Sequence, residues 1–594
     1  MQKEFLALYH DELQSFRQQA NAFAHKHPEA ANKLRLAEGV ADDPHVERLI
    51  ESFAFTAARI RYKLNDSFPE LSAGLLEALY PHLLCPLPAM GLVNLMPTPD
   101  LTNVQRVPRG LELQSETIQG DRCRFRTTQV VDLVPAKVST IAYHPSLQSA
   151  SKKSFAGAQS ALKITLQPLK TNVFLANVGL KDLKFHLSGA FEQASTLYME
   201  ICKHTIGVKI SDPDNQSTSH LLSANYVQPT GFTDDESLLP VSPNFNAGFR
   251  LLSEFFILKR KFLFFTLNGL EQWSECSTAK ALELTIYFDR TNAALNKNFL
   301  PEHITLNTTP VVNLFKQQCE PLQISSNRQH TALVPDYRFR QSRKIHSILE
   351  ISAVSSQEPP IVCQSIYQSN TNSQKNQLFW QIIREPYADE HDDIAINFSG
   401  HALKNGKEFV TKIEAFCTNG LLPLQLPYNA GTLELSPAKP HSNVETAQCL
   451  IPFTAPALKP LSGEQLWPFI AHLRHGYIHT GCKNEQVLKD ILYLYQRPND
   501  AEADKYIHNI QSIVPRSTLC RIKQGGFAAA TDFNIYFTDN SLSAPEIYLF
   551  ATVLHRFLNF YTSINSSARV TAWNGRQSIA VVRFPFHTSL QYAV

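Results

Sequence analysis

The sequence has little charge, little glycine and no closely spaced cysteines. Asp, Glu, Lys and Arg make up 18% of its 594 residues, against about 25% in average globular proteins, and only 22 residues are glycine. The 55 basic and 53 acidic residues almost cancel. The chain therefore lacks the basic excess with which proteins neutralise nucleic-acid phosphates, and we expect no nucleic-acid partner.

Segments typical of membrane insertion or secretion are also missing. The longest uncharged stretch, residues 78–99, contains five prolines that would interrupt a spanning helix. The chain is charged from Lys3 onward, without the apolar region of a signal peptide. No two cysteines are closer than Cys417 and Cys449, which excludes zinc-ribbon and thioredoxin-type spacings. We expect reduced, mostly buried thiols and no direct membrane insertion.

Standard catalytic motifs are absent: there is no Walker A loop, GxGxxG, GxSxG, HExxH or EF-hand loop. The best local candidate is the set His472, His475, His479 and Cys482. On one continuous helix these side chains would fall within an arc of about 80° and could bind a metal. Two glycines in the stretch weaken such a helix, so we favour a helix with partly exposed histidines and no cofactor. A metal-assisted hydrolase at 472–482 is the alternative.

Apolar residues, including 37 phenylalanines, are abundant and follow helical spacing near the N-terminus. A first helix ends before Pro28, a second begins at Asp43 and Pro44, and a third runs from Pro69 to about Tyr80. Three such helices can pack together, or each can lend its apolar stripe to another chain. They carry more apolar surface than a short domain buries by itself, so we expect contacts with partner chains. The candidate interface residues are Phe5, Tyr9, Phe16, Val46, Leu49, Phe53, Ile60 and Leu64.

The rest of the chain alternates strand patterns with turns, which predicts an α+β multidomain protein with sandwich-like or barrel-like middle domains. The runs Leu197–Ile210 and Phe255–Phe265 are among the expected strand regions. The strand-rich middle also fits a glycan-binding or peptide-binding module. The predicted divisions are a helical region at 1–90, a β-rich domain at 91–297, a second β-rich domain at 298–427, a proline-rich linker or arm at 428–460, and an α+β domain at 461–594.

The segment Asp43–Pro88, DPHVERLIESFAFTAARIRYKLNDSFPELSAGLLEALYPHLLCPLP, resembles the N-terminal signature of the TssF (ImpG/VasA) family, baseplate subunits of bacterial type VI secretion systems. Asn65 stands where the family usually has an acid. The stretch QGGF at Gln524 replaces the more charged sequence that we would expect before the late strand. Further similarities span nearly the whole chain: VPRGLEL at Val107, CRFRT at Cys123, SEFFILKRKFLFFTLNGL at Ser253, TPVVNLF at Thr309, LVPD at Leu333, CTNGLLPLQLP at Cys417 and PEIYLFATVLHRFLNFYTSINS at Pro545.

This resemblance implies a scaffold that is not an enzyme, in the cytoplasm at the inner face of the inner membrane. In the family, two TssF copies join one TssG in a wedge that TssK binds. Six wedges surround the spike and carry the sheath and the tube. The implied fold is similar to that of wedge proteins in contractile phage baseplates, where helices from different subunits form a shared bundle.

Overall fold

The computed structural model divides the chain into two compact units. Met1–Leu84 with Pro460–Arg474 form the first, here the helical unit, and Cys85–Lys459 with His475–Val594 form the second, here the main unit. The structure describes residues 2–588 except 34–35, 38–39, 42–43, 66–68, 148–154, 214–218, 241–246, 272, 274–278, 297–298, 325–330, 356–358, 369–377, 384–393, 401–402, 404–407, 429–430, 438–440, 442, 458–462, 473–484, 498–499, 522–525, 539–540, 560–565 and 576–578.

The helical unit contains the three predicted N-terminal helices and a helix from late in the chain. The boundaries follow the sequence signals: Pro44 occupies the first turn of its helix, and Glu47 lies where the helix dipole favours an acid. Its elements are α1 (Gln2–Lys26), α2 (Pro28–Lys33), β1 (Leu36–Ala37), β2 (Val40–Ala41), α3 (Pro44–Asn65), α4 (Pro69–Leu79) and α9 (Gly463–His472).

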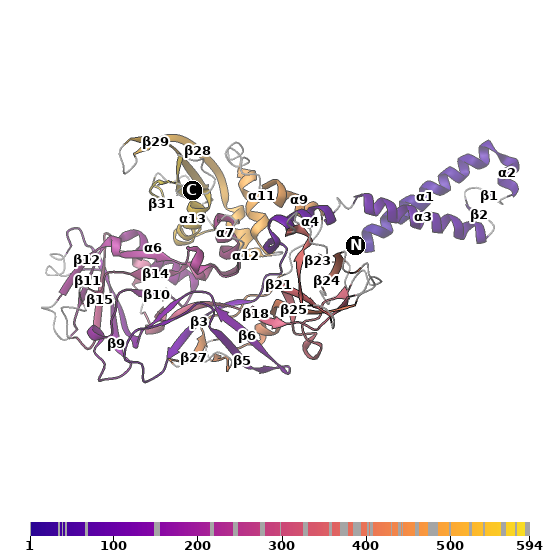
Figure 1. The fold of residues 1–594 in the computed structure, drawn as a ribbon. Helices are drawn as coiled ribbons and strands as arrows, with labels where there is room; N and C mark the ends of the chain where they lie inside the picture. The colour runs from indigo at the N-terminus through magenta and orange to yellow at the C-terminus, as the bar shows by residue number, and fades with distance from the viewer. Residues whose placement is uncertain are drawn as a thin grey trace. The chain divides into compact units, whose positions relative to one another are not determined.

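A closed six-stranded barrel lies in the main unit, and its strands come from three distant parts of the chain (Figure 1). In sheet order they are β17 (Thr308–Val312), β3 (Met90–Pro97), β27 (Val444–Cys449), β26 (Thr432–Leu435), β5 (Glu112–Ile118) and β6 (Asp121–Thr127). Residues 428–460, expected to form a linker or arm, therefore supply two barrel strands. Their prolines fall outside those strands, so ladder pairing with β3 and β5 is possible.

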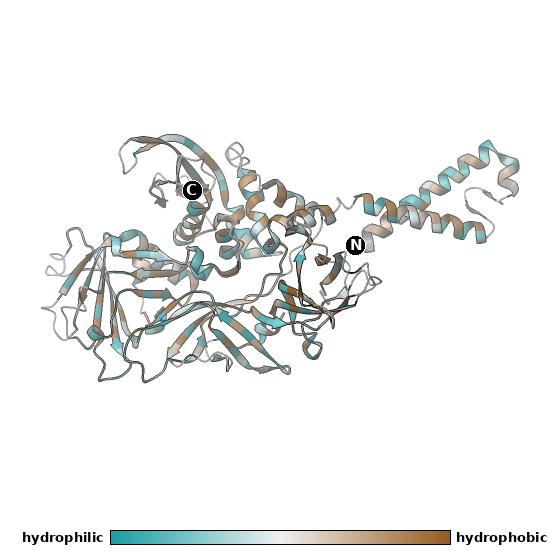
Figure 2. Cartoon of the chain, viewed as in Figure 1, coloured by the Kyte–Doolittle hydropathy of each residue, from teal (hydrophilic) through white to brown (hydrophobic). Residues whose placement is uncertain are grey.

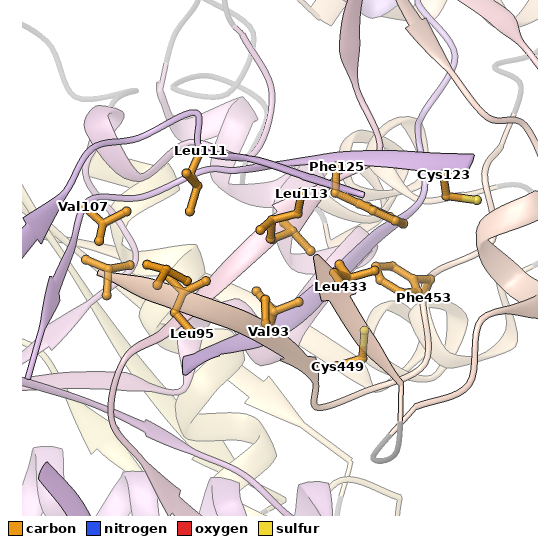
Figure 3. Packing of buried hydrophobic residues seen from close by; sticks show 14 of the residues in the cluster. Val93, Leu95, Val107, Leu111, Leu113, Cys123, Phe125, Leu433, Cys449 and Phe453 are labelled. Atoms are coloured by element: carbon orange, nitrogen blue, oxygen red, sulfur yellow. The ribbon is translucent and has the colours of Figure 1, made fainter. Parts of the chain in front are cut away.

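Side chains from every part of the barrel fill its interior (Figure 3). Phe125 on β6 stacks on Phe453 with ring centroids 4.5 Å apart. A Cβ atom at Gly91 would lie 2.8 Å from the Phe453 ring, so the bare backbone of β3 makes room for that ring. The barrel interior is therefore a core of packed apolar side chains.

Two further sheets and two buried helices occupy the part of the main unit between the barrel strands β6 and β17 in sequence. One sheet has the order β12 (Ser219–Ser223), β11 (Thr205–Ser211), β15 (Leu282–Phe288), β9 (Ser160–Pro168) and β8 (Ala136–His144). The other has the order β13 (Val227–Thr230), β14 (Phe264–Leu267), β10 (Leu183–Leu187) and β16 (Ile304–Thr305). A short ladder pairs β4 (Gln105–Val107) with β7 (Val131–Leu133).

Two expected strand regions in this part of the chain are only partly strands. Helix α6 (Phe191–His204) occupies residues 197–204 of the run Leu197–Ile210, and β11 forms the rest. Helix α7 (Ala247–Leu258) occupies the first four residues of the run Phe255–Phe265, a 3-10 helix (Lys259–Phe262) follows, and β14 begins only at Phe264. Both helices are buried on nearly all sides. Helix α6 buries polar as well as apolar residues, among them Ser195, Thr196 and Glu200, so the polarity of its residues does not mark which of them are exposed. A short apolar run inside such a helix cannot be told from a buried strand by periodicity alone.

An eight-stranded sheet follows the barrel strand β17 and is antiparallel except where β22 runs parallel to β23. Its apolar residues form a core cluster separate from that of the barrel. In sheet order the strands are β18 (Phe315–Gln318), β25 (Phe409–Thr418), β21 (Lys344–Val354), β22 (Ile361–Ser365), β23 (Leu378–Ile383), β24 (Ala395–Gly400) and β20 (Thr331–Ala332), with β19 (Gln323–Ile324) paired to β25.

The C-terminal part combines a sheet with the buried helix α13 (Ala544–Asn559), which starts where Ser543 bonds to the Glu546 carboxylate. Its apolar faces pack against α6 and α7 as well as β30, and the Phe255 and Phe550 rings stack at 5.2 Å. The observed mixture of helical, barrel and α+β parts confirms the predicted fold class. The remaining elements are α11 (Glu485–Tyr495), α12 (Ala501–His508), β28 (Ile510–Arg521), β29 (Phe527–Phe537), β30 (Ser566–Asn574), β31 (Val582–Arg583) and β32 (His587–Thr588).

A buried polar network joins the barrel to the eight-stranded sheet. Arg343, just before β21, donates two hydrogen bonds to the carboxylate of Asp121 on β6, at 2.7 and 3.0 Å. Asn419, after β25, donates to the same carboxylate at 3.3 Å and accepts from the side chain of Asn313 at 2.9 Å. All four side chains are buried. Because the charged groups of Arg343 and Asp121 are paired, the network holds the barrel against the eight-stranded sheet without leaving an uncompensated charge.

We expect Phe125→Ala to lower the free energy of barrel opening by about 3–5 kcal/mol, because it leaves a cavity beside Phe453. Hydrogen–deuterium exchange of peptides from β3 and β6 measures this change. Phe527→Ala is the control, since Phe527 is 74% exposed and should change stability by less than about 0.5 kcal/mol. Equal protection in both variants would contradict the packing argument.

We expect Asp121→Asn to destabilise the main unit by about 3–5 kcal/mol, because it leaves the buried guanidinium of Arg343 short of a counter-charge. Burial acts to raise the pKa of Asp121, but hydrogen bonds and charge from Arg343 outweigh it and hold that pKa below its usual value. The stabilisation is therefore complete above about pH 4 and is lost as the pH falls through the lower, folded-state pKa.

Urea unfolding followed between pH 2 and pH 7 tests this linkage. The difference between wild type and Asp121→Asn should shrink on acidification. Glu414→Gln, which removes an exposed pair with Lys316 at 3.8 Å, is the control and should cost at most about 1 kcal/mol. A difference that stays constant across the pH range would show that Asp121 acts by packing alone.

Candidate functional site

Helices α1 and α3 lie side by side as a two-helix hairpin (Figure 1). Ala54 and Ala58 on α3 are completely buried, so small side chains let the two backbones approach. The Phe5 ring packs edge-on against Phe55 at a centroid distance of 5.3 Å. Arg17 donates to Glu47 at 2.6 Å, a partly exposed pair near one end of the hairpin. One face of each helix is thereby used inside the hairpin.

The predicted interface residues divide between the inner and outer faces of this hairpin. Phe5 and Tyr9 contact Phe55 and are half-buried. Phe16 and Val46 are also half-buried. The four large apolar residues of α3 are instead between 58% and 65% exposed, and these are Leu49, Phe53, Ile60 and Leu64.

These four residues, which we call the α3 stripe, lie on a face of α3 that α1 does not cover. At 100° per residue they fall within an arc of about 60°, centred about 130° from the buried Ala54 and Ala58. Figure 2 shows hydrophobic residues recurring along the length of α3. A soluble helix normally buries such a stripe, so the α3 stripe is an exposed apolar surface that the hairpin itself leaves uncovered.

A second apolar surface in the helical unit lies on α4 and α9, which pack together. Leu76 and Leu466 are buried, while Leu71, Leu79 and Trp467 are exposed. The sequence pattern identified the leucines of α4 but did not associate them with α9, because the two helices are almost four hundred positions apart. None of the described helices is long and apolar enough to cross a membrane.

The buried ionisable groups of the main unit are arranged as structural pairs. Lys261 is fully buried and contacts the carboxylate of Glu254, which also accepts from Arg250 at 3.0 Å and from the Leu238 amide at 2.8 Å. Burial lowers the pKa of Lys261 to about 8, still above neutral pH. The ammonium group is therefore charged and paired, and it has no exposed surface on which to meet a substrate.

Three cysteines and one histidine of the main unit are also shielded from solvent. Burial raises the pKa of the Cys123 and Cys449 thiols to about 11 and that of Cys202 to about 12. Burial lowers the pKa of His186 to about 3, so this ring is neutral between the Ser188 hydroxyl and the Arg260 carbonyl. Protonated thiols and an enclosed neutral imidazole are poor nucleophiles and bases.

The sequence-predicted metal ligands are not placed. His472 is the last residue of α9, but its side chain and residues 473–484, which include His475, His479 and Cys482, lie outside the described residues. Across the described ranges, no group of three or more His, Cys, Asp or Glu side chains could hold a metal ion.

Comparison with known proteins covers nearly the whole chain. The family model described as "Type VI secretion system, TssF" matches residues 1–591. The chain is 27% identical, over 97% of both sequences, to "Type VI secretion system component TssF1" of Pseudomonas aeruginosa PAO1.

Two solved structures share the fold. A chain in the cryo-electron microscopy structure of the type VI secretion TssK-TssF-TssG baseplate subcomplex has a TM-score of 0.74 at 22% identity, covering 91% of this chain and 98% of its own. A chain of the type VI secretion baseplate complex has a TM-score of 0.62 at 20% identity, covering 98% and 99%. The family match confirms the resemblance that the segment Asp43–Pro88 indicates. The chain belongs to the TssF family of the type VI secretion system.

Proposed function

We propose that this chain is a structural subunit of a type VI secretion baseplate and that it works by assembly, without bond chemistry. Its partners are a TssG subunit, a second copy of the chain, TssK, and the spike and sheath components of the baseplate. It acts in the cytoplasm, at the inner face of the inner membrane through the assembled apparatus. Membership of the family along nearly the full chain supports this role, and so does the shared fold of chains in type VI secretion baseplate complexes.

The α3 stripe is the observation that carries the proposal. Complete burial of a leucine, isoleucine or phenylalanine side chain contributes about 1.5–3 kcal/mol, and the stripe leaves four such side chains more than half exposed. Their spacing along one helical face matches the way an amphipathic helix inserts into a groove or joins a bundle. We infer that helices of another subunit cover the α3 stripe.

The chemistry of the described side chains supports a role without catalysis. The thiols of the main unit that burial shifts are protonated at neutral pH, and Lys261 is enclosed in an ion pair. These groups stabilise the fold and present no nucleophile or base to solvent.

Charge on the α3 stripe should abolish assembly while leaving the chain folded. We expect the triple variant Leu49→Asp, Phe53→Asp and Ile60→Asp to lose co-purification with TssG, because buried carboxylates without partners would oppose docking. Affinity capture of the co-expressed subunits, followed by quantification of each band, measures the loss.

Arg59→Glu is the matched control, since it changes charge at an exposed position of the same helix outside the stripe. Circular dichroism should show equal helicity in both variants, because exposed substitutions change stability by at most about 0.5 kcal/mol. Normal TssG capture by a folded triple variant would overturn the assignment of this surface.

Elemental analysis tests the metal-hydrolase alternative directly. We expect the purified chain to contain no stoichiometric transition metal, because the glycine-interrupted stretch 472–482 is poorly suited to hold its four candidate ligands in place. A bound metal that is lost on His475→Ala would contradict the proposal and favour the hydrolase.

A further inference from the structure

Strand β28 is 12 residues long and forms one edge of the C-terminal sheet. It pairs with β29 on one side, and none of the strands that the structure describes pairs with its other side. Figure 1 shows the two strands as a long hairpin, here the β28–β29 hairpin. Residues 516–519 are all exposed, so both faces of this part of β28 are in solvent. Such an edge strand offers unpaired backbone groups to another chain.

Pro515 indicates which amides of β28 point away from β29. Proline has no N–H, and it fits a ladder where that group would face outward. It lies opposite Phe533 of β29. Because outward and inward amides alternate along an antiparallel pair, the amides of Ser517, Leu519 and Arg521 face outward as well. Among the described residues, none of these three amides donates to a backbone carbonyl outside the sheet.

The exposed half of the β28–β29 hairpin carries cations and no acid. From residue 510 to residue 531 the sequence contains Arg516, Arg521 and Lys523 but neither Asp nor Glu. Lys523 lies outside the described residues. The side chains of Arg516 and Arg521 are exposed, and within the described part of the chain they form no hydrogen bond or ion pair. Two cations on this edge are therefore available to a ligand.

The acid beside these cations is already paired. Asp532, opposite Arg516 in the ladder, accepts from Arg569 at 2.6 Å and from the Thr571 hydroxyl at 2.9 Å, and Arg583 lies 3.7 Å away. Three arginines thus surround one carboxylate. Helices α11 and α12 also contact β28, but Figure 1 shows them at the base of the hairpin, away from its tip. The exposed half keeps an excess of positive charge, which favours an acidic occupant.

Apolar side chains accompany the cations on one face of the β28–β29 hairpin. Leu519 is 68% exposed, and Phe527, the first residue of β29, is 74% exposed. Phe527 lies opposite Arg521, two residues after Leu519, so Leu519 and Phe527 are diagonal neighbours on the same face. A strand added along β28 would place a side chain against Leu519, with Phe527 next to it.

We propose that the outer edge of β28 binds an extended polypeptide segment of a partner protein, which adds a strand to the C-terminal sheet. The segment carries Asp or Glu beside Arg516 and Arg521 and an apolar residue against Leu519. Backbone hydrogen bonds to the outward amides hold it in register. The proposal concerns the main unit and does not depend on the α3 stripe or on the baseplate role.

Two other occupants fit this edge less well. Two-fold antiparallel pairing with β28 of a second copy would bring equal cations close together near the middle of the strand, which is unfavourable. A lipid surface could meet the cations and Phe527, but its apolar interior would leave the outward amides without acceptors. An extended acidic segment satisfies both the charges and the amides.

Selection from a random peptide display library on the purified full-length chain supplies the probe. The enriched peptides should combine Asp or Glu with β-branched or aromatic residues, and fluorescence anisotropy gives the Kd of the tightest. Methylation of alternate backbone nitrogens removes the donors of one edge of this peptide and keeps every charge. We expect methylation of the edge that faces β28 to weaken binding about tenfold or more, because hydrogen bonds are lost. Methylation of the other edge should have little effect.

Ser517→Pro is the matching test on the chain. It removes one outward N–H from β28, as Pro515 already does two residues earlier, and its ring obstructs an added strand. Ser517→Ala is the control, since it removes the same exposed hydroxyl but keeps the N–H. We expect the proline variant to weaken binding about tenfold and the alanine variant to leave the Kd unchanged. Equal melting temperatures would show that both variants are folded.

Charge reversal tests the acidic character of the ligand. Arg516→Glu with Arg521→Glu should weaken binding about tenfold or more and reduce its dependence on salt. Lys137→Glu with Lys209→Glu reverses one exposed and one half-buried cation on another sheet and should leave the Kd unchanged. If the arginine variant is misfolded, the two Ser517 variants still decide.

Several results would overturn the proposal. Enriched peptides without acidic residues, or a peptide that tolerates methylation of either edge, would do so. A library that yields no peptide would show that Pro515 and the arginines only protect the edge from pairing. Binding to vesicles of phosphatidylglycerol and phosphatidylcholine that Arg516→Glu with Arg521→Glu abolishes would assign the edge to a lipid surface. Self-association that Ser517→Pro abolishes would identify a second copy as the occupant.

Discussion

The ion pair between Arg343 and Asp121 links the barrel of the main unit to its eight-stranded sheet. It joins the first residue of β6, in the barrel, to the residue before β21, in the eight-stranded sheet. Charges this deeply buried are costly unless they are paired and hydrogen-bonded, and Asn419 completes the pairing. Asn419 also lines an open groove of the main unit, so the network that fixes the relation of the two sheets extends to that surface.

A different constraint governs the helical unit. Two helices that pack against each other bury one face each, and in this hairpin the small residues Ala54 and Ala58 define that face of α3. The four residues of the α3 stripe therefore remain outside. Low overall charge and abundant phenylalanine fit this arrangement, because surfaces that other subunits cover need fewer charged residues than surfaces that stay in water. Contact with another subunit would bury the α3 stripe, which the hairpin alone leaves exposed.

Local sequence signals predicted the elements that have one polar and one buried face. Helices α3 and α4 begin at the predicted Pro44 and Pro69, and α1 ends at Lys26, before Pro28. The predictions were wrong where α6 and α7 overlap the expected strands, because both helices are buried on nearly all sides and a short buried run looks the same in a helix and in a strand. Strands β26 and β27 were missed because the prolines between Tyr428 and Pro460 resemble those of a linker, and only pairing with distant strands reveals their role.

The sequence by itself determined the family, the three N-terminal helices and the apolar stripe that includes Leu49 and Phe53, since each depends on residues close together in the chain. Only the tertiary structure decided which face of α3 remains exposed, because that depends on where α1 packs. It alone brought residues 337–345 beside 418–425 to form the groove. The physical reason is the same in both cases: helical periodicity is local, whereas exposure and the grouping of charges depend on contacts between segments far apart in sequence.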